Sequence, residues 1–289
     1  MLRSVPYSFP SVLHGAPVAD KLKATIKHKV HGYRQRGITP KMVTILIDGD
    51  PASAFYARQK ARIGKKLGVD VEIIELAGSI TQQEVANLVH DLCDNTSIHG
   101  VMVELPLPAH IDLTVILKEL SPDKDIDGLT DANRMANVVG STGIYPATPL
   151  ACLSLLDHYG IDLYGREVVL IGFGKTVGNP LFHGLMREGA TVTVCTEHTR
   201  DLKAHLKRVS VGIVAVGYAG LITTDMVHPD LILIDAGMSE REDGSMAGDV
   251  CPTVAPRVAA LTPTPGGVGT VTTTQLFSNL LHAMSLQGI

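Results

Sequence analysis

The sequence predicts a two-domain α/β protein. Its second domain should be a doubly wound parallel sheet, and its C-terminal helix should return to the first domain. The prediction depends on a length of 289 residues, a glycine-rich turn directly after a buried apolar segment, and alternating strand-like and helix-like segments on both sides of that turn. We expect residues 1–147 and 270–289 to form the first domain and residues 148–269 to form the second.

The glycine turn lies in the stretch VVLIGFGKTVGNP, which begins at Val168. Its apolar start fits a strand buried on both faces, and Gly172, Gly174 and Gly178 follow with the spacing GxGxxxG. Glycines permit a sharp turn, close approach of the backbone to a pyrophosphate, and tight packing of the next helix. A second strand follows, and Glu197 stands 19 residues after Gly178, where carboxylates that bind a ribose are found. A glycine trio alone often marks only a tight turn, but with this continuation it predicts a Rossmann-type dinucleotide site.

Composition excludes several classes of partner. The formal charge of −4 comes from 25 basic and 29 acidic residues that are interspersed, with no basic stripe for nucleic acid or an anionic membrane. Aromatic residues make up only 4% and Trp is absent, which argues against base stacking. The first eleven residues hold one Arg and no apolar run, so we expect neither a signal peptide nor a membrane anchor. The four cysteines form no CxxC pair, which indicates reduced thiols in a cytoplasmic protein and no metal site.

Hydrophobic spacing predicts the elements of the first domain. Val18, Leu22 and Ile26 recur at helical intervals, and Thr81 with Glu84 forms a capping box. The expected elements are a helix at 14–35, a strand at 42–47, a helix at 52–67, a strand at 69–75, a helix from 81 to 93, a strand at 100–103 and a short helix at 113–120.

The second domain repeats strand and helix units. A helix after Pro146 and Pro149 leads into it. The expected elements are strands at 168–171, 190–195, 212–216 and 231–234, a helix after the glycine turn, a helix at 200–208, and a final helix at 272–284 that follows PTPGGVG.

Few residues of the first domain are singled out by spacing alone. Tyr56 and Lys60 stand at i and i+4 and share one helix face, where a desolvated lysine could transfer protons and a tyrosine could stack on a flat substrate. Glu104 ends a strand at ELPLP and Asp127 lies in a loop, both at element ends where sheet proteins bind ligands. From spacing alone, an amphipathic helix with a solvated lysine and two solvated carboxylates is the favoured interpretation.

The motifs taken together resemble the bifunctional methylenetetrahydrofolate dehydrogenase/cyclohydrolase family of one-carbon metabolism, over nearly the whole chain. The matching pieces, in order, are PASAFYARQK, VMVELPLP, PDKDIDG, YPATP, VGNP, GDV at 248–250 and TPTPGGVG. Each piece is modest alone, but their order and spacing are specific.

The resemblance implies a tetrahydrofolate substrate, a nicotinamide cofactor and a homodimer. Lys60 would be the acid/base residue, with Tyr56, Glu104 and Asp127 as the other catalytic positions. The implied substrate-binding residues are Tyr56, Leu105, Asp127, Gly266, Gly267 and Val268. The implied cofactor-binding residues are Thr148, Gly172, Phe173, Gly174, Lys175, Thr176, Val177, Gly178 and Glu197.

Departures from the family pattern qualify the cofactor and the second reaction. The family implies NADP, but Phe173 and Glu197 replace the residues that commonly bind the 2′-phosphate, which favours NAD. Glu104 replaces the usual Gln, and a carboxylate beside Lys60 would favour its ammonium form and hinder its service as a base. We therefore expect weak hydrolysis relative to dehydrogenation. A dehydrogenase without cyclohydrolase activity, or a non-catalytic folate- or nucleotide-binding relative, are the alternatives.

Overall fold

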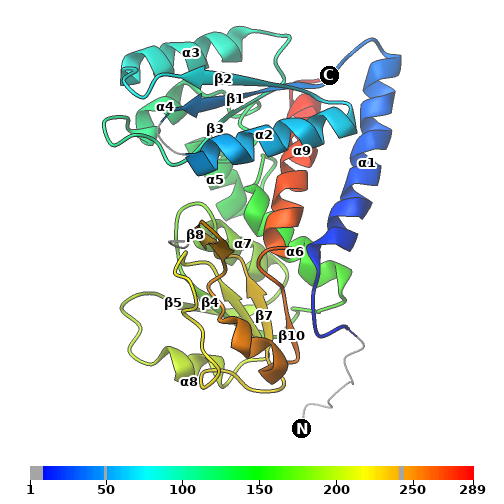
Figure 1. The fold of residues 1–289 in the computed structure, drawn as a ribbon. Coiled ribbons are helices and arrows are strands. Elements are labelled where there is room, and N and C mark those ends of the chain that lie inside the picture. The colour runs from blue at the N-terminus through cyan, green and yellow to red at the C-terminus, as the bar shows by residue number, and fades with distance from the viewer. Residues whose placement is uncertain (1–8, 49–50, 241–243) are drawn as a thin grey trace. The chain divides into compact units, whose positions relative to one another are not determined.

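The computed structural model describes residues 9–48, 51–240 and 244–289 of the chain (Figure 1). The chain folds into two compact units. The first unit comprises residues 19–147 and 273–289, and the second comprises residues 1–18 and 148–272. None of the helices in the described part of the chain has the length and apolar character that crossing a bilayer requires.

A three-stranded parallel sheet in the order β2-β1-β3 organises the first unit. Its strands are β1 (Lys41–Ile47), β2 (Asp70–Leu76) and β3 (Gly100–Val103). The helices are α1 (Gly15–Gln35), α2 (Pro51–Leu67), α3 (Gln82–Asp94), α4 (Leu113–Glu119) and α9 (Val268–Leu286). One sheet face packs against α1, α2 and α9, and the other against α3 and α4, so α2 and α3 lie on opposite sides of β1 in Figure 1. Buried on both faces, β1 is apolar apart from Lys41 at its start and the buried Thr44.

Most of these elements lie within two residues of their predicted bounds, and the capping box is confirmed. The Thr81 side chain accepts from the Glu84 amide, and the Glu84 carboxylate accepts from the Thr81 amide. The helix α9 begins at Val268, four residues earlier than expected.

The helix α5 (Asp131–Val139) was not predicted, because its burial pattern is the reverse of ordinary amphipathicity. Asn133 and Asn137 are buried, whereas Met135 and Val139 are exposed. The buried asparagine Asn133 donates to the backbone of Pro122 and accepts from the amide of Ile144. Two asparagines and one alanine therefore make the inward face, and hydrophobic periodicity does not indicate it.

The second unit is built on a five-stranded parallel sheet in the order β10-β7-β6-β4-β5. Its strands are β4 (Glu167–Ile171), β5 (Thr191–Cys195), β6 (Val211–Val214), β7 (Ile232–Asp235) and β10 (Ala260–Leu261). Because β5 and β6 lie on opposite sides of β4, the strand order reverses at β4. This is the doubly wound, Rossmann-type sheet that the sequence predicts.

Helices cover both faces of this sheet. The helices α6 (Ala147–His158) and α7 (Gly178–Arg187) pack on one face, while α8 (Leu202–Leu206) and the 3-10 helix η1 (Pro252–Arg257) pack on the other. A hairpin of β8 (Ser239–Glu240) and β9 (Met246–Ala247) completes the unit. Neither η1, β10 nor this hairpin was predicted, because each is too short to show a period.

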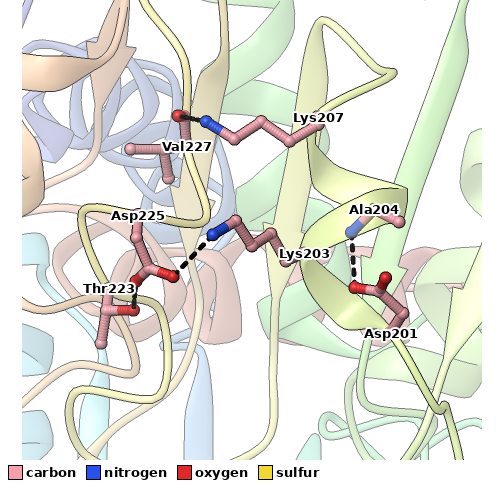
Figure 2. Close-up of polar contacts among 7 residues, drawn as sticks. All are labelled: Asp201, Lys203, Ala204, Lys207, Thr223, Asp225 and Val227. Atoms are coloured by element: carbon pink, nitrogen blue, oxygen red, sulfur yellow. Dashed lines mark hydrogen bonds and ion pairs between the residues drawn. The ribbon is translucent and has the colours of Figure 1, made fainter.

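Exposed polar contacts hold α8 to the segment that precedes β7 (Figure 2). Lys203 Nζ lies 3.0 Å from a carboxylate oxygen of Asp225, and Lys207 donates to the carbonyl of Val227. Hydrogen bonds from Thr223 and then Lys203 lower the pKa of Asp225 to about 2. These are surface contacts that order a five-residue helix, and we assign them no chemistry.

The N-terminal segment differs from the division drawn on the sequence, which had placed it in the first domain. Val12 forms a parallel bridge with Leu261, and Leu13 is buried in the core of the second unit. The amide of Leu13 donates to the carbonyl of Leu261 at 2.9 Å. The segment therefore adds a short pairing partner to β10.

Candidate active site

Helix α2 carries the two candidate residues of the first unit on one face. Tyr56 and Lys60 are one turn apart and both half-buried, while the Phe55 ring, 5.7 Å from that of Tyr56, is exposed. Near the start of the helix, the hydroxyl of Ser53 donates to the carbonyl of Leu105 at 3.1 Å. This bond ties α2 to the ELPLP segment after β3, which Leu105 continues through a cis peptide to Pro106.

The principal feature of the site is an ion pair between Lys60 and Glu104. Lys60 Nζ lies 2.6 Å from Glu104 Oε1, with side chains only 12% and 8% exposed. The amide of Glu104 donates to Ile45 at 2.9 Å, so the carboxylate stands at the carboxyl end of the sheet. A largely desolvated pair retains much of its attraction, and removing either partner would leave an uncompensated charge.

Asp127 lies within electrostatic reach of this pair. Burial raises the pKa of the half-buried Asp127 carboxyl to about 7, with Lys60 opposing the rise and Asp125 and Glu104 adding to it. The ammonium of Lys60 is the strongest influence that favours the ionised form, but it does not offset the burial of the carboxyl. A carboxyl that is protonated near neutral pH can donate a hydrogen bond as well as accept one.

Three supporting residues escaped the sequence interpretation. Asn279 of α9 donates to the carbonyls of Ile126 and Tyr145 at 2.8 and 2.9 Å, and Gln275 donates to the Asn279 side chain. The buried carboxylate of Asp125 accepts from Thr130 and Asn133. These bonds hold the loop that carries Asp127. The one sequence signal was the pair of amide residues at i and i+4 within α9.

In the second unit, the glycine turn has the close backbone approaches that a dinucleotide site requires. A Cβ at Gly172, where φ is +91°, would lie 2.2 Å from the carbonyl oxygen of Ala215, and one at Gly178 would lie 2.1 Å from that of Gly172. A Cβ at Gly174 would meet no atom within 4 Å, so its backbone is open to an incoming group. The exposed segment 173–176 leads into α7 at Gly178. Because backbone amides at a helix start favour phosphate, this turn fits a pyrophosphate.

The other cofactor candidates border the turn. Cys195 ends β5 beside Ile171, and its carbonyl accepts from the amide of Gly172 at 2.9 Å. Glu197 follows two residues later with its side chain 81% exposed, 3.7 Å from His198. Phe173 is exposed and lies 5.9 Å, ring to ring, from Phe182.

Thr148 and the PGGVG segment complete the set of candidates, and all belong to the second unit. The hydroxyl of Thr148 lies 3.4 Å from that of Thr272. The carbonyl of Gly266 accepts from the amide of Gly15 at 2.8 Å. Gly267 follows, and Val268 begins α9. The structure thus brings Lys60, Glu104 and Asp127 together in one unit, and groups the glycine turn with Glu197 in the other.

Comparison with known families decides the identity of both units. Residues 13–127 match the tetrahydrofolate dehydrogenase/cyclohydrolase catalytic domain, and residues 146–288 match the NAD(P)-binding domain of the same family. The chain belongs to this family. It is therefore an enzyme of one-carbon metabolism with the two domains that serve tetrahydrofolate dehydrogenase and cyclohydrolase activities.

Individual relatives align with this chain over nearly its whole length. The bifunctional protein FolD of Heliobacterium modesticaldum is 44% identical over 277 residues, covering 96% of each chain. The crystal structure of FolD from Campylobacter jejuni is 35% identical, with a TM-score of 0.92 and coverage of 96% of this chain and 99% of that one. FolD from Trypanosoma brucei, complexed with NADP cofactor and inhibitor, is 30% identical, with a TM-score of 0.90 and coverage of 96% and 98%.

The raised pKa of Asp127 predicts a specific effect of pH on stability. Between about pH 4 and 7 the unfolded chain loses the Asp127 proton while the folded enzyme keeps it, so the folded state is progressively destabilised as the pH rises. Asp127→Asn removes this cost. We expect the apparent Tm of the variant, relative to that of wild type, to rise by roughly 2–6 °C between pH 4 and pH 8.

The measurement is thermal unfolding at several pH values. Asp157→Asn, which changes an exposed carboxylate in the same way, is the matched control and should show no such trend. A constant Tm difference for Asp127→Asn across this range would contradict the prediction.

Proposed function

We propose that the chain oxidises 5,10-methylenetetrahydrofolate to 5,10-methenyltetrahydrofolate with NAD(P), and hydrolyses the product to 10-formyltetrahydrofolate with Lys60 as the proton-transfer residue. The observation that carries this proposal is the Lys60–Glu104 ion pair beside Asp127, within the unit that matches the family's catalytic domain. A lysine side chain at this position can donate a proton to the substrate as an ammonium or accept one as an amine.

The dehydrogenase step requires little chemistry from the side chains of the first unit. A bound nicotinamide would supply the hydride acceptor for the methylene carbon, so the protein need supply only alignment and exclusion of water. Tyr56, half-buried on the same face of α2 as Lys60, offers a flat ring on which the folate can stack. Asp127, with its raised pKa, can both donate to and accept from the edge of the pterin.

Hydrolysis requires more chemistry from the protein, because it includes proton transfer. Water adds to the methenyl carbon and loses a proton, which gives a carbinolamine. The bond from that carbon to N5 then breaks as N5 takes up a proton and the carbinolamine hydroxyl gives up its own to become the formyl carbonyl. Lys60 can mediate this transfer only to the extent that its amine is released from Glu104. This same contact favours a second candidate function, a dehydrogenase in which hydrolysis is weak or lost.

The cofactor preference follows from the surroundings of the glycine turn. Glu197 lies just beyond the end of β5, next to the strand that leads into Gly172. Its carboxylate can accept from the 2′-hydroxyl of NAD but would repel the 2′-phosphate of NADP, and position 173 holds Phe in place of a cation. We therefore infer a preference for NAD. Because Glu197 is 81% exposed, solvent screens the repulsion and the preference should be moderate.

We further infer from the family resemblance that the enzyme is a homodimer and acts in the cytoplasm. The exposed edge strand β5, which pairs only with β4 among the described strands, is compatible with a contact between copies.

Replacement of Lys60 tests the proposed function directly. Lys60→Met removes the charge at similar volume, and should reduce methenyl hydrolysis by at least about 100-fold because general acid–base catalysis contributes on that order. The assay follows methenyltetrahydrofolate formation and decay by absorbance. Lys66→Met, on the exposed face of the same helix, is the control and should behave as wild type. Full hydrolysis by a folded Lys60→Met variant would remove Lys60 from the mechanism.

Replacement of Glu104 tests whether the ion pair restrains hydrolysis. Glu104→Gln keeps the shape and removes the charge, so it should raise the hydrolysis rate near pH 7 several-fold and change dehydrogenation less. Methenyl hydrolysis is measured against pH and corrected for the uncatalysed rate, with Glu75→Gln as an exposed control in the same unit. An unchanged or lower rate would show that Glu104 does not restrain Lys60, and a lower rate would indicate that Glu104 assists the attacking water.

The cofactor preference is tested by comparing kcat/KM for NAD and NADP in the dehydrogenase assay. We expect NAD to be favoured several-fold, and Glu197→Ser to reduce or invert that ratio because the repelling carboxylate is gone. Glu188→Gln serves as an exposed control in the same unit. A clear wild-type preference for NADP would refute this reading of Glu197.

A further inference from the structure

The GDV motif at 248–250 contains a buried carboxylate whose hydrogen bonds all run to one loop. Asp249 is fully buried. Its Oδ2 accepts from the amides of Val216 and Gly217 at 2.7 and 3.0 Å, and its Oδ1 accepts from the amide of Tyr218 at 2.8 Å. Three consecutive backbone donors therefore converge on one side chain, and no interaction within the loop itself is needed to satisfy them.

A second carboxylate holds Asp249 in place. Asp235, at the end of β7, accepts from the amides of Asp249 and Val250 at 3.1 and 3.0 Å. Each carboxylate also lies very close to a glycine backbone. A Cβ at Gly237 would lie 2.0 Å from the Asp249 carboxyl carbon, and a Cβ at Gly248 would lie 2.0 Å from Asp235 Oδ2. Burial raises the pKa of Asp235 to about 6, against the lowering effect of these backbone amides. The hydrogen bonds of Asp235 and Asp249 therefore connect the end of β7 to the loop after β6.

That loop stands where a dinucleotide sheet binds its ligand. The strand order reverses at β4, between β5 and β6, and ligands of such sheets bind at the carboxyl ends of the strands on either side of the reversal. The glycine turn follows β4, and residues 216–218 follow β6. The two segments touch, since the carbonyl oxygen of Ala215 occupies the space that a Cβ at Gly172 would need. Residues 216–218 are themselves exposed.

We propose that Asp249 is a positioning residue for the dinucleotide: its carboxylate fixes the backbone of residues 216–218 in the conformation that NAD(P) binds. The cofactor does not touch Asp249, which acts through the loop. The proposal rests on the dinucleotide site inferred above at the glycine turn. It explains why the motif combines a glycine with an acid, because only the glycine leaves room for Asp235.

The test is Asp249→Asn in the full-length enzyme. An amide keeps the shape but has a single acceptor oxygen, so its NH2 group must face at least one backbone donor. We expect KM for NAD(P) to rise by about tenfold or more, with a smaller change in kcat. The KM for methylenetetrahydrofolate and the hydrolysis of supplied methenyltetrahydrofolate, which requires no dinucleotide, should stay unchanged. Asp230→Asn, an exposed carboxylate of the same unit, is the matched control.

A second variant covers the case in which Asp249→Asn fails to fold. Gly217 has φ of +79° and open space around its Cβ position, so Gly217→Ala strains the loop backbone without a clash and should give the same separation of effects. Unchanged KM for NAD(P) in either folded variant would overturn the proposal. So would a parallel loss of both activities in both variants, which would mark Asp249 as structural only. Wild-type methenyl formation tests the proposed function independently of these outcomes.

Discussion

The ion pair between Lys60 and Glu104 is the interaction on which the chemistry of the first unit depends. With both side chains nearly excluded from water, neither charge could persist there without the other. The pair also joins α2 to the end of β3, so the proton-transfer candidate is held by the sheet rather than by a mobile side chain. The two charges of the pair also act on Asp127 in opposite directions, since Lys60 lowers the pKa of that carboxyl and Glu104 raises it.

In the second unit, buried carboxylates are stabilised by a different kind of partner than in the first. Asp235 and Asp249 are satisfied mainly by backbone amides, which approach closely because Gly237 and Gly248 have no side chains. A backbone amide does not change its protonation state near neutral pH, whereas an ammonium can lose its proton. One unit therefore has a charge arrangement suited to moving protons, and the other has one suited to holding a loop still. This division agrees with a catalytic domain and an NAD(P)-binding domain.

Much of the fold could be predicted because parallel strands and their helices carry strong periods. β1, β3 and β4 are buried on both faces and appear as largely apolar runs, and a capping box marks the start of α3. The helix α5 could not be found, because two of the three residues that it buries are asparagines. Their partners, the carbonyls and carboxylates of a loop, are visible only once the loop is folded.

The candidate site shows the same limit. The i, i+4 spacing predicts that Tyr56 and Lys60 share a face, and the motif order identifies the family, because both are properties of consecutive residues. Spacing alone favoured a solvated Lys60. Its contact with Glu104, 44 positions away, exists because α2 packs on the sheet face toward which Glu104 projects. Asp249 was part of a recognised motif, yet nothing adjacent to it indicated that its partners are the amides of residues 216–218.

The sequence by itself therefore determined the alternation of elements, the glycine turn, the family and the residue types available for chemistry, since each is encoded in local order. Only the tertiary structure decided which charges meet, which are buried and which carboxyl keeps its proton near neutral pH. The physical reason is that pairing and desolvation depend on distances between segments far apart in the chain, and these distances are set by packing rather than by any local pattern.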